Sequence, residues 1–164
     1  MASSNKRGQA VFDLIIVVII LFVLALAAVF GAYVYDELND EIQNDADFSA
    51  QAKESAQFVD TNYSNWFDNV IITVLIFLWI LLLVTSFLID AHPVFFIVTV
   101  LLLIVVFIAG MAMANSYAEL TSDSELSGFA ANMPKTAFVF DNLLIVLIIM
   151  GLTASLSLYA KSNL

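Results

Sequence analysis

The stretch WFDNVIITVLIF, residues 66–77, places one carboxylate, Asp68, directly in front of a long apolar run. The same arrangement occurs in VFDLIIVVIILF, residues 11–22, and in VFDNLLIVLIIM, residues 139–150. The chain as a whole is 62% hydrophobic and only 12% charged. An average soluble domain has roughly 25% charged residues, so these runs indicate a membrane protein.

Four apolar segments are long enough to cross a bilayer, whose core of about 30 Å requires roughly 20 residues of helix. They cover residues 12–35, 69–89, 94–115 and 138–160. Each segment is continuously apolar, whereas the strands of a membrane barrel alternate apolar and polar residues. The sequence therefore predicts an all-α integral membrane protein with four transmembrane helices and acidic polar connections.

Two of the connections are long. Residues 36–68 form an acidic loop that we expect to be partly helical, because apolar residues recur at helical spacing until Asp45 and Ser49 interrupt them. Residues 116–137 are rich in Ser, Ala and Asn and contain one Gly and one Pro, which favours a polar loop with room for a short interfacial helix.

The third connection, DAHP at residues 90–93, is short enough to predict a tight hairpin in which Pro93 begins the next helix. It holds the only histidine, His92, close to Asp90. No nucleophile, second histidine or metal-ligand spacing accompanies this pair, so we interpret it as a hairpin cap. The chain has no cysteine, which excludes thiolate chemistry and disulfides. We expect no enzymatic activity, no metal and no cofactor.

The formal net charge is −10, and it is unevenly distributed. The N-terminal arm, residues 1–11, and the C-terminal tail, residues 161–164, belong on one side of a four-span protein, and their Lys and Arg residues favour the cytoplasmic or interior side. Residues 36–68 and 116–141, which include the two long connections, then carry thirteen acidic residues against two lysines on the other side. Phosphate binding depends on Lys and Arg, so we expect no nucleic acid at that face.

An aspartate in the first turn of a helix meets the positive end of the helix dipole, which is worth about 0.3–1 kcal/mol, whereas in mid-bilayer it costs about 2.5–3.5 kcal/mol. The sequence predicts such helix starts at Asp13, Asp68 and Asp141. Aromatic residues beside them fit the belt at headgroup level: Trp66, Phe67 and Phe140. A ring of carboxylates that binds cations is the alternative, but Asp13 begins its helix from the opposite side.

Small residues near the ends of the third and fourth spans predict close helix packing and self-association. They are Gly110, Ala114, Gly151 and Ser155. None of the four spans places an ionisable residue at mid-membrane, where carriers usually have one. Ion-coupled transport is therefore disfavoured.

The segment KRGQAVFDLIIVVIILFVLAL, residues 6–26, resembles the start of type IV prepilins and class III signal sequences. The resemblance implies cleavage after Gly8, with Gln9 following the cut and Asp13 at the position of that family's glutamate. A cleaved first helix would then polymerise. Three further spans count against this interpretation.

In architecture the whole chain, including HPVFFIVTVLLLIVVFIAGMAMANSYAEL at residues 92–120, resembles the small multi-span membrane proteins of viruses that contain a lipid membrane. The resemblance implies a non-enzymatic structural protein of the virion membrane. Many copies would associate, curve the bilayer and contact a capsid or spike layer through the polar loops. Two alternatives stay open, namely an accessory subunit of a cellular membrane complex and a holin-like pore former.

Overall fold

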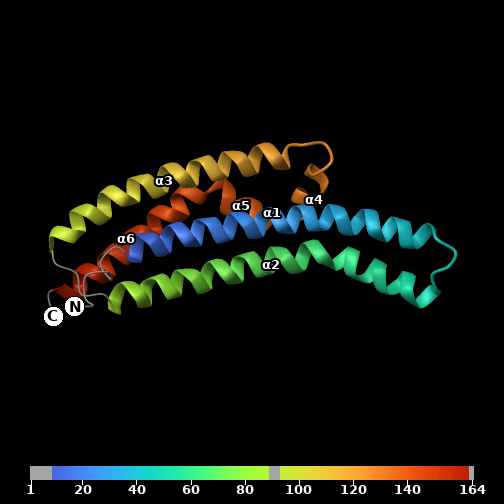
Figure 1. Ribbon diagram of the computed structural model, residues 1–164, viewed down its shortest axis with the longest axis horizontal. Helices are drawn as coiled ribbons and strands as arrows, with labels where there is room; N and C mark the ends of the chain where they lie inside the picture. The colour runs from blue at the N-terminus through green and yellow to red at the C-terminus, as the bar shows by residue number, and fades with distance from the viewer. Residues whose placement is uncertain (1–8, 89–92, 163–164) are drawn as a thin grey trace, which may run out of the picture.

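The computed structural model describes residues 9–88 and 93–162. These residues form six helices: α1 (Gln9–Asn44), α2 (Ala50–Leu88), α3 (Pro93–Thr121), α4 (Ser127–Ala131), α5 (Pro134–Asp141) and α6 (Leu143–Ser162). No strand occurs in the two described ranges, so the predicted all-α class is confirmed. The four long helices, α1, α2, α3 and α6, run along a common direction (Figure 1).

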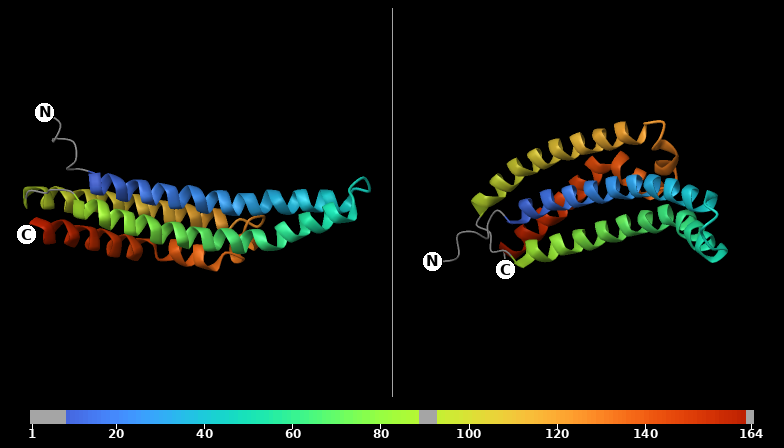
Figure 2. Two further views of the ribbon diagram at one scale, coloured as in Figure 1. Left: turned by 90° about the horizontal axis from the view of Figure 1, so that it is seen from below. Right: turned by 45° about the vertical axis from the view of Figure 1, so that its right-hand side comes forward.

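Among the described residues, α1, α2 and α3 are each long and apolar enough to cross a membrane. A fourth candidate consists of α5 and α6 together, with a bend of 70° between them. The chain is thus a multi-pass integral membrane protein. Helix α1 begins and helix α6 ends at the same end of the bundle (Figure 2).

The hairpin of α1 and α2 is longer than a bilayer is thick. The two helices have 36 and 39 residues, which at 1.5 Å per residue is roughly 54 and 58 Å. The apolar core of a membrane measures about 30 Å, so both helices continue into the aqueous phase. In Figure 1 their connected ends project beyond α3 and α6. Residues 36–68, predicted to be a partly helical loop, are therefore helical on both sides of a short turn at residues 45–49.

The turn of this hairpin lies at residues 45–49, between the two places where the sequence interrupts the helical pattern. Asp45 Oδ1 accepts a hydrogen bond from the backbone N–H of Asp47 at 2.8 Å. Ser49 Oγ accepts one from the N–H of Ala52 at 3.2 Å and so caps the start of α2. Short polar side chains thus end one helix and begin the next.

The inner face of α1 follows a spacing of four and three residues, which keeps one stripe of the helix toward its neighbours. The buried residues of this stripe are Leu14, Val18, Leu21, Ala25, Ala28 and Ala32. Its small alanines let backbones approach closely. Large apolar residues such as Ile16, Val23 and Phe30 are exposed instead, and within a bilayer they face lipid.

Two predicted spans differ from the structure. The third helix begins at Pro93, as predicted, but continues past residue 115 to Thr121. The short helix α4 lies in the predicted polar connection, as expected. The fourth predicted span, residues 138–160, is not straight, because the chain bends at Asn142 between α5 and α6. Asp90 and His92 of the predicted hairpin lie outside the described residues.

Candidate functional site

The side chain of Asp68 lies in the middle of α2 and is only 2% exposed. It therefore does not begin its own helix, and that prediction is wrong. Its carboxylate instead meets the N-terminus of α5, where Oδ1 accepts from the backbone N–H of Thr136 at 2.7 Å and from the Thr136 hydroxyl at 2.8 Å. Oδ2 accepts from the backbone N–H of Lys135 at 3.2 Å.

These contacts satisfy the first turn of α5. A helix begins with N–H groups that have no partner inside the helix, and Pro134 at the first position has no N–H. The next two N–H groups, of Lys135 and Thr136, donate to Asp68, and the N–H of Ala137 donates to the carbonyl of Met133 at 3.0 Å. Asp68 thus caps α5 from a neighbouring helix. Its favourable interaction with a helix dipole was expected at the start of its own helix and occurs instead at the start of α5.

The predicted aromatic anchors divide into two groups. Trp66 is exposed, as a headgroup anchor should be, while Phe67 is partly buried and stacks on Tyr63 with ring centroids 4.5 Å apart. Phe140 is only 2% exposed and stacks on Tyr117 at 4.3 Å. Its prediction as a membrane-surface anchor is therefore wrong, because it fills the core beside the Asp68 contact.

The other two predicted helix-start aspartates have different surroundings. Asp13 lies in the second turn of α1, is partly exposed, and lines a small groove of about 160 Å³ together with Thr85 of α2. Asp141 is exposed and is the last residue of α5, two residues before α6 begins. Only Asp68 is both buried and hydrogen-bonded to another helix.

The small residues of the third and fourth spans mostly pack inside this chain. A Cβ added at Gly110 would overlap the end of the Leu147 side chain, and one at Gly151 would lie 2.8 Å from Leu103 Cδ2. Both glycines therefore permit close contact between α3 and α6. Ser155 is buried and Ala114 partly buried on the same two helices. Both glycines are therefore covered by side chains of the same molecule and do not form a surface for self-association.

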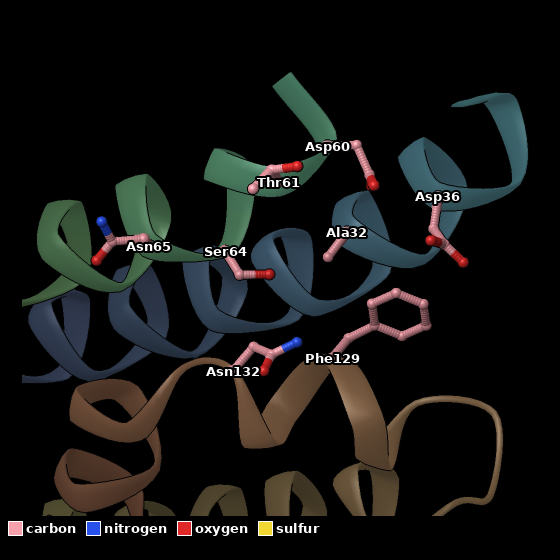
Figure 3. Close-up of a pocket in the computed structure, with 8 residues that line it drawn as sticks. All are labelled: Ala32, Asp36, Asp60, Thr61, Ser64, Asn65, Phe129 and Asn132. Carbon is pink, nitrogen blue, oxygen red and sulfur yellow. The ribbon is translucent and has the colours of Figure 1, made fainter. Parts of the chain in front are cut away.

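A polar pocket of about 400 Å³ opens between the aqueous part of the α1–α2 hairpin and α4 (Figure 3). Helix α1 supplies Ala32 and Asp36, and Phe129 comes from α4. Asn132, the residue that follows α4, also lines the pocket. Helix α2 supplies the remaining four lining residues: Asp60, Thr61, Ser64 and Asn65. Asp36, Asp60 and the Phe129 ring surround one side of the space in Figure 3.

The pocket has an acidic electrostatic character. Partial burial raises the pKa of Asp60 above its usual value of 3.8, and the negative charges of Asp36 and Asp40 raise it further. Asp60 Oδ2 accepts one long hydrogen bond, from Asn39 Nδ2 at 3.5 Å. None of the eight described lining residues is Lys, Arg or His. Two carboxylates therefore face the same space without a compensating base in its wall.

None of these pocket residues was among the site residues predicted from the sequence. The signal was available in the spacing, since residues 60, 61, 64 and 65 are one, four and five positions apart and share one face of a helix. Helical spacing indicates this shared face, but it does not show that the face lines a pocket. The contribution of α4 could not be read from spacing, because it depends on how the 116–137 connection folds back.

No group of three or more His, Cys, Asp or Glu residues that could hold a metal ion occurs in the described part of the chain. Comparisons with known protein families, with curated proteins and with solved structures find no match to this chain.

Proposed function

We propose that this chain is a non-enzymatic structural membrane protein. An apolar helix bundle anchors an acidic helical hairpin that binds a protein partner, and many copies organise the bilayer. The single observation that carries this proposal is the continuation of α1 and α2 beyond the apolar part of the bundle.

The projecting hairpin is built to keep its shape. Near its tip Gln43 Nε2 donates to the carbonyl of Lys53 at 2.8 Å, and Lys53 Nζ donates to the carbonyl of Gln43 at 2.8 Å. Further toward the membrane Tyr35 and Tyr63 stack with centroids 5.9 Å apart. These hydrogen bonds and this ring stacking between the two helices favour a rigid arm. The arm reaches roughly 15 Å past the last apolar turn of α1.

The charge of the arm supports a basic partner. Residues 36–60 contain eight acidic side chains and one lysine. Acidic and basic surfaces attract each other over about a Debye length, near 8 Å at physiological salt, and this steers association. A layer of protein with a basic inner surface, such as a shell apposed to the membrane, fits this arm.

The first test is to fractionate native material on a density gradient and to identify cross-linked partners and copy number by mass spectrometry. The proposal expects many copies per assembly and cross-links from Lys53 to one protein. A single copy bound to a fixed membrane complex would support the accessory-subunit alternative instead.

The second test uses two variants with equal charge changes at exposed sites. Glu41→Gln with Glu54→Gln alters the arm, and Glu119→Gln with Glu125→Gln alters the other acidic connection. We expect the arm variant to weaken partner binding about tenfold at low salt, since rim charges act mainly on association, and the control variant to bind normally. Equal binding by both variants would exclude the arm as the contact surface.

A further inference from the structure

The pocket between α1, α2 and α4 has room for more than an ion. Its volume of about 400 Å³ falls within the range of roughly 300–1,000 Å³ that is usual for small-molecule sites. Three elements that are distant in sequence form its walls, so the space exists only in the folded chain. The arm function proposed above does not require this pocket.

Its chemistry favours a positively charged organic group. The carboxylates of Asp36 and Asp60 face the cavity without a base among the described lining residues. Partial burial, and after it the negative charges of Asp36 and Asp40, raise the pKa of Asp60, and a cation in the cavity would offset those charges. The ring of Phe129 borders the same space (Figure 3), and aromatic faces attract cations.

The remaining wall is polar. Thr61 and Ser64 contribute hydroxyl groups, and Asn65 and Asn132 contribute amide groups, all of which have an oxygen that can accept a hydrogen bond. A primary ammonium group has three donors and no acceptor, so it matches this set. A bare divalent ion would leave most of the cavity unfilled and would meet only two carboxylates.

We propose that this pocket binds a primary ammonium group, which Asp36 and Asp60 hold and Phe129 covers. Two sources share this chemistry, an ethanolamine lipid headgroup and a soluble amine. The headgroup is within reach, because Asn65 directly precedes Trp66, which is exposed next to the apolar part of α2.

The test titrates the full chain in detergent micelles with ethanolamine and, in parallel, with ethylene glycol, a neutral molecule of similar size. We expect saturable binding of ethanolamine only. Asp60→Asn should weaken it by about tenfold, since hydrogen bonds to charged groups are among the stronger ones. Asp47→Asn, the same change at an exposed residue of the hairpin turn, should leave it unchanged.

One further variant tests the aromatic wall, and circular dichroism guards against misfolding as the cause. Phe129→Leu keeps an apolar wall but removes the aromatic face, and we expect a loss of about threefold. Helical circular dichroism should be the same for all variants. No saturable binding, or an equal loss in Asp60→Asn and Asp47→Asn, would overturn the proposal.

The source of the ammonium group is resolved in nanodiscs made of phosphatidylcholine alone or with added phosphatidylethanolamine. If the lipid is the ligand, its presence should reduce the apparent affinity for soluble ethanolamine in the wild-type chain. An unchanged affinity in both discs would identify a soluble amine as the ligand. Either result supports the pocket, whereas absence of ethanolamine binding in both discs would refute it.

Discussion

Asp60 and Asp68 lie on the same helix, α2, eight residues apart, but their carboxylates have opposite surroundings. Asp68 is buried and accepts three hydrogen bonds from the start of α5. Asp60 borders an open pocket, accepts one long hydrogen bond and faces two other carboxylates. The side chain of Asp68 joins α2 to α5, while that of Asp60 is available to a ligand.

The difference separates acidic residues that stabilise the fold from acidic residues that are available for binding. A buried carboxylate with donors on both oxygens stabilises the fold, because removal would leave those donors without partners. A carboxylate among like charges costs stability, and proteins commonly keep such groups where they serve binding. The three predictions below test this contrast.

The largest effect is expected for Asp68→Ala. The N–H groups of Lys135 and Thr136 would lose their acceptor at a buried site, which should lower the free energy of unfolding by roughly 2–4 kcal/mol. Thermal unfolding in detergent micelles measures the loss. Asp141→Ala, at an exposed aspartate of the same region, serves as the matched control and should change stability little. Equal effects of the two variants would refute the capping role of Asp68.

A smaller effect is expected for Thr136→Val. The backbone N–H of residue 136 keeps its bond to Asp68, and only the bond from the hydroxyl at 2.8 Å is lost. We expect a destabilisation of about 1 kcal/mol. In the double variant with Asp68→Ala, the two losses should not add, since both remove the same hydrogen bond. Simple additivity would mean that the two side chains act independently.

The smallest effect, and the only stabilising one, is expected for Asp60→Asn. The pKa of Asp60 is raised in the folded chain, so its ionised form is disfavoured there. Below its unfolded pKa the carboxyl is neutral in both states and costs nothing, and the penalty appears as the pH rises through the folded pKa.

The variant should therefore be more stable than the wild type at pH 7, by about a few tenths of a kcal/mol for this largely hydrated group. The difference should vanish near pH 3.5. Comparison of unfolding at the two pH values tests this, and a destabilised variant at pH 7 would contradict the contrast with Asp68. Combined with weaker ethanolamine binding, a stabilised variant would mark Asp60 as a binding residue.

Much of the fold could be predicted from the sequence because apolar run length determines how a chain crosses a bilayer. The interruptions at Asp45 and Ser49 coincide with the turn of the hairpin. The partner of Asp68 could not be predicted, since it depends on α5 folding back onto α2. Phe140 was misplaced for a related reason, because its burial follows from the 70° bend between α5 and α6.

The pocket was missed for a different reason. The continuous helix through residues 50–67 gives Asp60 and its polar neighbours one face, which their spacing indicates, but spacing does not show that Asp36 and Phe129 lie opposite that face. The existence of that helix therefore supports both the arm and the ammonium site.

The most direct test is a spin-label scan along residues 50–67 of the full chain in nanodiscs, which measures accessibility to a water-soluble nickel complex. The absence of native cysteine makes single-site labelling straightforward. The account predicts accessibility with a period of about 3.6 residues, low at the buried Ala56 and high at the exposed Ser55 and Phe58. Uniformly high accessibility would describe a flexible loop and would contradict the projecting hairpin.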